Sequence, residues 1–194
     1  MQKKSKLIFT TKMLTSCALL AALSVVLARL FSLMPAESVR FSIEAVPIFL
    51  AGLFFGPIPG ALVGFTADFV GCMFSPYPYN PVFCVPPILY GVFAGLLRYY
   101  LCGKPNLLRL TLGWLPPVVL GSVFYQSAAL AWVYGDGVFF ESFLVYLGSR
   151  SIQFAITMVL DVLIVYLLCR TNIFKRMGIW PQRKENEDER GTSH

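Results

Sequence analysis

Six apolar segments dominate this sequence and limit what it can fold into. They lie at 12–31, 43–56, 57–76, 82–102, 108–134 and 144–170. Several approach the roughly 20 residues that a helix needs to cross the hydrocarbon core of a bilayer. Only helices and closed barrels pair all their backbone amides in lipid, and no segment shows the alternation of a barrel strand. The pattern therefore predicts an all-α integral membrane protein, a bundle of six transmembrane helices.

The composition agrees with a membrane location. Of the 194 residues, 57% are hydrophobic and 13% are charged, whereas soluble domains contain about 25% charged residues. The first apolar run is longer than the 7–15 residues of a signal-peptide core, so it is interpreted as a retained first helix. We expect three parts: a basic N-terminus over 1–11, a membrane domain over 12–172 and a polar tail over 173–194.

The second apolar segment is the shortest, at about 14 residues, and needs a special explanation if it is to span a bilayer. We expect its helix to be extended at the interface by residues 40–43. A tilted or partly re-entrant segment is the alternative.

The basic residues predict the orientation, because short loops rich in Lys and Arg stay cytoplasmic. Thirteen of the sixteen lie before the first segment, around the loop after the fourth, or after the sixth. Both termini and the Gly56–Gly60 turn are then cytoplasmic, and the 75–81 and 135–143 loops belong to the outer side. Membrane topology accounts for the net charge of +6 without a nucleic-acid partner.

Several kinds of chemistry are missing from the sequence. There is no G-x-x-x-x-G-K-[ST] phosphate loop, so any dependence on ATP has to come from partners. The only histidine is His194, which leaves no Ser-His or Cys-His pair and no H-E-x-x-H motif. The five cysteines are scattered without a C-x-x-C pair and are interpreted as small buried hydrophobes. We predict no enzyme activity, no cofactor and no metal.

Two carboxylates flank the tight turn Gly56-Pro57-Ile58-Pro59-Gly60 between the second and third segments. At about 1.5 Å rise per helical residue, Glu44 lies roughly 18 Å from the turn and Asp68 roughly 12 Å. Both therefore reach the same membrane half. Ionisable groups at that depth usually face a bundle interior or a water-filled cavity and often mark a ligand path. The alternative for Asp68 is an ordinary salt bridge between helices.

Other polar groups reach the same half, and together they define the predicted substrate site. Its residues are Arg40, Glu44, Asp68, Tyr77, Tyr79, Asn80, Gln126, Arg150 and Gln153. Arg150 can bind a ligand carboxylate through its planar fork, or else extend to the interface without a ligand. Tyr77, Tyr79 and Asn80 can form a stacking lid, or the tyrosines belong to the interfacial aromatic belt. Asp161 is expected to lie too deep for this site and to be a structural partner or an intersubunit contact.

The first helix carries a pair of small residues, Ala18 and Ala22, four positions apart. This spacing lets a second helix approach closely in lipid. On its own the pair is a weak signal, because small residues are common in membrane helices.

The sequence resembles the substrate-binding S components of energy-coupling factor (ECF) vitamin transporters, specifically their folate-type branch. The likeness extends over about 12–172 and is most specific in "VPIFLAGLFFGPIPGALVGFTADFVG". "ALLAALSVVLARLFS" in the first segment, Arg40 before the second, and Tyr134-Gly135 followed by Arg150 support it.

The resemblance implies a binding subunit in the bacterial cell membrane that captures a vitamin, folate above all, from outside. It also implies a transmembrane coupling subunit, contacted through Ala18 and Ala22, and two ATPase subunits on separate chains. In a folate complex, Glu44 or Asp68 would accept hydrogen bonds from the pterin edge, Tyr77 or Tyr79 would stack on the ring, and Arg40 or Arg150 would bind the carboxylates. An S component for another vitamin or precursor and a non-transporting MreD-like scaffold are the alternatives.

Overall fold

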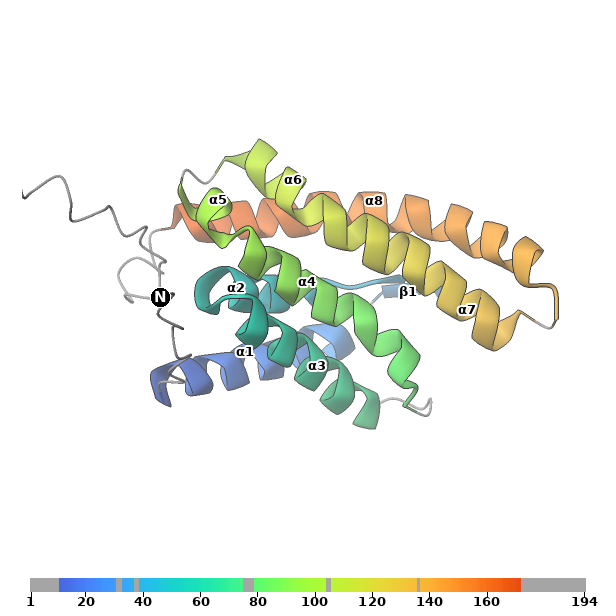
Figure 1. Cartoon of the computed structure of the whole chain (residues 1–194), viewed down its shortest axis with the longest axis horizontal. Helices are drawn as coiled ribbons and strands as arrows, with labels where there is room; N and C mark the ends of the chain where they lie inside the picture. Colours follow the sequence, from blue (N-terminus) through green and yellow to red (C-terminus); the bar gives the residue numbers. More distant parts are fainter. Residues whose placement is uncertain are drawn as a thin grey trace, which may run out of the picture.

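The computed structural model describes residues 11–30, 33–36, 39–74, 79–103, 106–135 and 137–171, within which the chain forms a bundle of helices with one short hairpin (Figure 1). In chain order the elements are α1 (Thr11–Leu30), β1 (Leu33–Ala36), β2 (Val39–Phe41), α2 (Ala45–Phe55), α3 (Pro57–Met73), the 3₁₀ turn η1 (Pro81–Cys84), α4 (Val85–Leu96), α5 (Arg98–Gly103), α6 (Leu107–Pro117), the π-helical segment η2 (Val118–Tyr125), α7 (Gln126–Tyr134) and α8 (Phe139–Arg170).

These helices follow the six apolar segments of the sequence closely. Three are long and apolar enough to cross a membrane: Thr11–Leu30, Leu107–Tyr134 and Phe139–Arg170. Three shorter apolar helices cover Ala45–Phe55, Pro57–Met73 and Pro81–Leu96. The start of α1, the α2–α3 turn, α5 and the end of α8 lie at the same end of the bundle (Figure 1). The segments therefore run up and down past one another.

The expected extension of the second helix through residues 40–43 is wrong. The helix begins at Ala45, and Arg40 lies in β2, which pairs antiparallel with β1 in the register Leu33↔Phe41 and Ala36↔Val39. Pairing across the hairpin satisfies backbone groups that a longer helix would otherwise have to bond internally. The 11 residues of α2 give a length of only about 16 Å, too short for a hydrocarbon core of about 30 Å.

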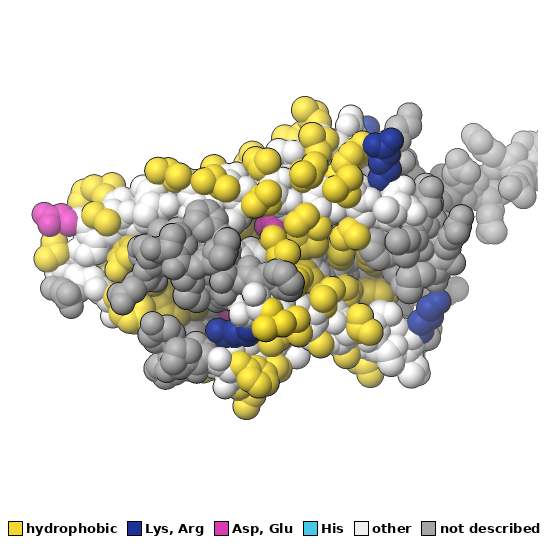
Figure 2. All heavy atoms as spheres, turned by 180° about the vertical axis from the view of Figure 1, so that it is seen from behind, with side chains coloured by type: hydrophobic (Ala, Val, Ile, Leu, Met, Phe, Trp, Pro, Cys, Tyr) yellow, Lys and Arg dark blue, Asp and Glu magenta, His cyan; other side chains and the backbone are white. Residues whose placement is uncertain are grey.

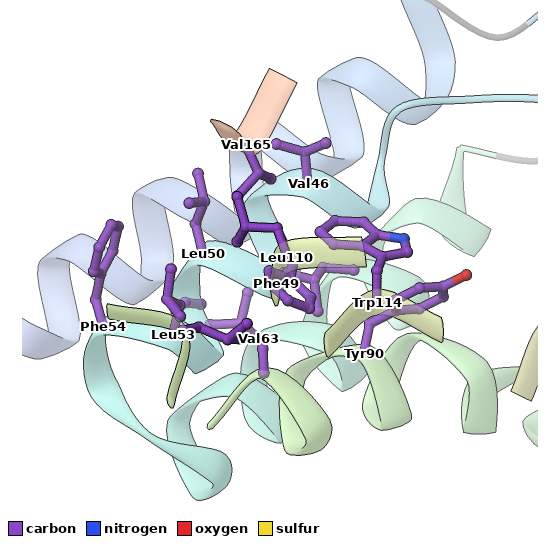
Figure 3. Close-up of a cluster of buried hydrophobic side chains, with 14 of the residues drawn as sticks. Val46, Phe49, Leu50, Leu53, Phe54, Val63, Tyr90, Leu110, Trp114 and Val165 are labelled. Atoms are coloured by element: carbon purple, nitrogen blue, oxygen red, sulfur yellow. The ribbon is translucent and has the colours of Figure 1, made fainter. Parts of the chain in front are cut away.

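The short α2 is tolerated because it lies inside the protein. Its nine consecutive residues 46–54 are all buried. Among them Phe49 packs against Trp114 of α6 with ring centroids 4.0 Å apart. Tyr90 of α4 lies 5.8 Å from the same indole ring, and Figure 3 shows these rings among the aliphatic side chains of the core. The other helices thus surround α2, and it does not need to match the bilayer thickness.

Glycines bring the backbones of α2, α3 and α4 into direct contact. A Cβ added to Gly91 would lie 2.1 Å from the carbonyl oxygen of Gly60, and one added to Gly60 would lie 2.5 Å from that of Gly91. A Cβ added to Gly52 of α2 would lie 2.2 Å from the carbonyl oxygen of Gly91. Gly56 joins α2 to α3 with φ of +105°, a conformation that side-chain-bearing residues rarely adopt. The tight helical hairpin predicted around this turn is therefore built on glycine.

Large apolar side chains cover much of the outer surface. Leu19, Leu30 and Ile152 are about 70% exposed, as expected for residues that face lipid rather than water. Figure 2 shows this hydrophobic surface between basic side chains at one end of the molecule and an acidic side chain at the other. The described helices are thus those of an integral membrane protein.

The glycine contacts generate a stability prediction. Gly91→Ala should lower the free energy of unfolding by about 1–3 kcal/mol or more, because the added methyl group has to push α3 and α4 apart. Gly148→Ala is the matched control, since a Cβ at Gly148 meets nothing within 4 Å. Thermal unfolding of the detergent-solubilised variants measures both. Equal midpoints for the two variants would contradict the close approach of the helices.

Candidate functional site

A cavity of about 280 Å³ lies between the helices, toward the end of the bundle that carries the α7–α8 turn. Its volume is close to the lower end of the roughly 300–1,000 Å³ usual for small-molecule pockets. Polar side chains from every long segment of the bundle line it: Ser24, Arg29, Ser42, Glu44, Asp68, Tyr90, Ser122, Gln126, Arg150, Gln153, Thr157 and Asp161. Such a concentration of polar groups inside an apolar bundle indicates a binding site.

The part of the cavity farther from the α7–α8 turn is called the inner level, and the part nearer to that turn the outer level. At the inner level α1, α2, α4, η2 and α8 contribute polar groups. Ser24 donates a hydrogen bond of 2.7 Å to the backbone carbonyl of Glu44. The hydroxyls of Tyr90 and Ser122 are hydrogen-bonded at 2.9 Å. Asp161 lies within electrostatic range of Glu44, and Tyr90 lies within range of both carboxylates. Two carboxylates and a pair of hydroxyls therefore lie within electrostatic range of one another at this level.

The outer level carries the guanidinium groups. Nη2 of Arg29, in the last turn of α1, donates to the carbonyl of Gly71 near the end of α3. Arg150 is only 8% exposed, and its guanidinium lies over the ring of Phe154 at 5.8 Å. The hydrogen bond of Arg29 joins α1 to α3. The helix dipole also favours this cation, because it lies near the C-terminus of both helices.

Helix α8 presents a row of polar side chains to the cavity. Arg150, Gln153, Thr157 and Asp161 are buried, and the buried residues that follow them toward the end of the helix, Val162, Val165 and Cys169, are apolar. Spacings of three and four residues place the four polar groups on one helix face. Arg150 and Asp161, the two ends of the row, are separated by about 16 Å along the axis. The row therefore carries a cation at its outer end and a carboxylate at its inner end.

Five of the residues predicted for the site line this cavity: Glu44, Asp68, Gln126, Arg150 and Gln153. Tyr79 does not. It is 37% exposed and packs edge-on against Phe69, with ring centroids 5.3 Å apart. Asn80 also lies outside the lining, where its side chain caps η1 by accepting a hydrogen bond of 3.1 Å from the backbone N–H of Val82.

Two further predicted residues cannot be located in the same way. Tyr77 lies outside the described residues, and so does the side chain of Arg40, whose backbone belongs to β2. The lid formed by Tyr77, Tyr79 and Asn80 stays a prediction.

Comparison with known proteins shows the family of the chain. Residues 8–175 match the family model described as ECF-type riboflavin transporter, S component. The chain belongs to this family. Among solved structures it is similar to the one described as the crystal structure of FolT bound with folic acid, with a TM-score of 0.72 and 25% identity over 84% of this chain and 95% of that one. No curated protein matches the sequence.

Membership of this S component family excludes the MreD-like scaffold that the sequence alone left open. The family consists of transporter subunits and not of enzymes. The resemblance to ECF S components is confirmed, and the fold of this S component is shared with FolT.

The predicted depth of Asp161 is corrected by the structure. It was expected to lie below the site, yet it lines the cavity and is 4% exposed. The reason is that the cavity continues inward along α8 by about three helical turns from Arg150. Asp161 in this S component is therefore a residue of the cavity.

Sequence reasoning also omitted several neutral and basic residues of the cavity. Tyr90, Ser122, Ser24 and Thr157 are single hydroxyls within apolar segments, and Arg29 is close to the end of one. The signal that could have revealed Tyr90 and Ser122 is their hydrogen bond, which joins positions 32 residues apart. That pairing is visible only once α4 and η2 are packed together.

The small-residue pair of α1 lies away from the cavity. Ala18 and Ala22 are both exposed, whereas the buried positions of α1 are Ala21, Ser24 and Ala28. The helix thus has one face toward the cavity and a different face open on the surface.

The bond between Arg29 and Gly71 generates a prediction. Arg29→Ala should lower the free energy of unfolding of the ligand-free protein by about 1.5–3 kcal/mol, because a charged hydrogen bond is lost between α1 and α3. Leu30→Ala, at a neighbouring position that is 75% exposed, is the control and should change little. Thermal unfolding in detergent compares the two, and equal stabilities would show that Arg29 does not hold the helices together.

Proposed function

We propose that this S component captures folate on the outer side of the bacterial plasma membrane and delivers it inward with a transmembrane coupling subunit and two ATPase subunits. The observation that carries the proposal is the charge arrangement of the cavity, with Arg150 at the outer level and the carboxylates of Glu44 and Asp161 at the inner level. Folate has the complementary arrangement, since glutamate carboxylates lie at one end and a ring rich in N–H donors at the other. The similarity to folate-bound FolT supports it.

Each predicted residue has a role in this proposal. Arg150 and Arg40 bind the glutamate carboxylates, for which the guanidinium fork has the right geometry. Glu44 or Asp68 accepts hydrogen bonds from the ring, because ionised carboxylates are acceptors only. Gln126 and Gln153 bond the middle of the ligand, and the residues of the lid, Tyr77, Tyr79 and Asn80, cover it from outside.

The proposed topology has six membrane spans with both termini in the cytoplasm. Its support is that α1 begins and α8 ends at one end of the bundle (Figure 1), and that Arg98, Arg109 and Arg170 belong to elements at this end. The positive-inside rule then makes this end cytoplasmic. The cavity lies toward the opposite end and is open to ligand from outside.

Riboflavin is the second candidate, because the description of the matching family names it. It has no carboxylate, however, so Arg150 would have no anionic group to bind. The charge arrangement of the cavity favours folate.

Calorimetric titration of the purified S component, alone in detergent, tests the proposal against folate, riboflavin and other vitamins. Nanomolar binding of folate, about −12 kcal/mol, is the expected result. Arg150→Ala and Glu44→Ala should each weaken folate about 10- to 100-fold, since each removes a hydrogen bond to a charged group. Ile152→Ala, 69% exposed on α8, should bind as the unmodified chain does. Tight riboflavin binding without folate binding would show that riboflavin, and not folate, is the substrate.

The surface of α1 is proposed as the contact with the coupling subunit, through Ala18 and Ala22. Replacing both with Trp should abolish folate uptake by cells that supply the other subunits, because the bulky rings prevent close helix approach. Folate binding by the isolated subunit should be retained, since both residues face away from the cavity. Ile156→Trp, at an exposed position of α8, is the control for an added surface indole. Loss of folate binding in the double variant would assign this face of α1 to the ligand site instead.

A further inference from the structure

We infer that Asp161 is the residue that selects the ligand ring: together with Glu44 it accepts hydrogen bonds from two adjacent N–H donors and disfavours rings that present a carbonyl there. The inference rests on the proposed function, because it concerns the same cavity, and it specifies which ring edge the inner level accepts. The pterin of folate carries a 2-amino group beside a ring N–H and thus provides two donors. The corresponding edge of a flavin carries one N–H between two carbonyls.

The burial of Asp161 is the first observation. The residue is 4% exposed, and its Oδ1 has no hydrogen-bond partner within the part of the chain that the structure describes. A buried carboxylate oxygen without a hydrogen-bond partner is costly, and the structure shows no salt bridge between Asp161 and a described basic residue. Since Asp161 lines the cavity, the group able to satisfy it is a donor on the ligand.

The surroundings of Asp161 are the second observation. Glu44, its electrostatic neighbour across the cavity, adds acceptor oxygens at the same level, whereas Arg150 lies about 16 Å away along α8. Even with one proton shared between the two carboxyl groups, Asp161 keeps an oxygen that accepts hydrogen bonds. A carbonyl oxygen placed among them would be repelled, because both sides would be acceptors.

The hydroxyl pair supplies the complementary donor. Tyr90 and Ser122 have one O–H each, and one of these is used in the 2.9 Å bond between them. The second O–H group is left to donate to an acceptor on the ligand. Both side chains line the cavity. The inner level therefore combines acceptors at Asp161 and Glu44 with a donor at Tyr90 and Ser122. A 2-amino-4-oxo ring matches this pattern, with its amino group and ring N–H facing the carboxylates and its 4-oxo group facing the hydroxyls.

Two ligands that differ at one position test the inference. Folate is compared with its analogue in which an oxo group replaces the 2-amino group, by titration of the full chain in detergent at neutral pH. We expect the analogue to bind about 100-fold more weakly, because it presents an acceptor to the carboxylates. Asp161→Asn should weaken folate about 10- to 100-fold and reduce the preference below about 10-fold, since the amide can also donate. Leu160→Ala, at the neighbouring exposed position, should keep the full preference.

The outcomes separate the two proposals. Equal binding of both ligands by the unmodified chain, or an unchanged preference in Asp161→Asn, would overturn the role of Asp161 while leaving folate as the substrate. Binding of riboflavin with no binding of folate would overturn both. If Asp161→Asn fails to fold, as judged by gel filtration and tryptophan fluorescence, the comparison of the two ligands on the unmodified chain still decides.

Discussion

The direct backbone contact between α3 and α4 at Gly60 and Gly91 is the constraint on which the rest of the structure depends. With the carbonyl of Gly60 only 2.1 Å from where a Cβ of Gly91 would lie, these two helices pack against each other without intervening side chains, and Gly52 of α2 approaches Gly91 in the same way. Close packing of small residues replaces the hydrophobic effect as a source of helix association in lipid. It also encloses α2, so that this short helix can begin inside the protein, where Glu44 just before its first residue contributes a carboxylate to the cavity.

Helix α8 divides its buried face between binding and packing. From Arg150 to Asp161 its buried side chains are polar and line the cavity, and beyond Asp161 the buried side chains of Val162 and Val165 belong to the core. Charged groups in a membrane interior cost free energy, so they persist mainly where they have a function. The boundary between Asp161 and Val162 therefore marks the floor of the cavity and the beginning of the packed core around Trp114.

Hydropathy predicted the helices well, because a backbone in lipid has to pair its own N–H and C=O groups and a helix is the simplest way to do so. It failed where protein rather than lipid surrounds the backbone, as at Arg40, which lies in a strand, and at Leu97, where the fourth segment divides into α4 and α5. Charges within apolar segments predicted the cavity positions of Glu44 and Arg150 for the same physical reason. Tyr90 and Ser122 gave no such signal, because hydroxyls cost little in a helix and their pairing depends on tertiary packing.

The matching family and the similar structure are described with different vitamins, and the fold alone does not choose between them. Shape is a weak criterion, because both vitamins carry a flat fused ring system. Hydrogen-bond polarity is a strong criterion, since a buried acceptor that meets another acceptor leaves both unsatisfied. In this cavity the acceptors are fixed by Asp161 and Glu44, and the outer cation is fixed by Arg150. With the roles proposed for these residues, a ligand brings donors to one end and an anion to the other, and this pattern separates folate from riboflavin without any change of fold.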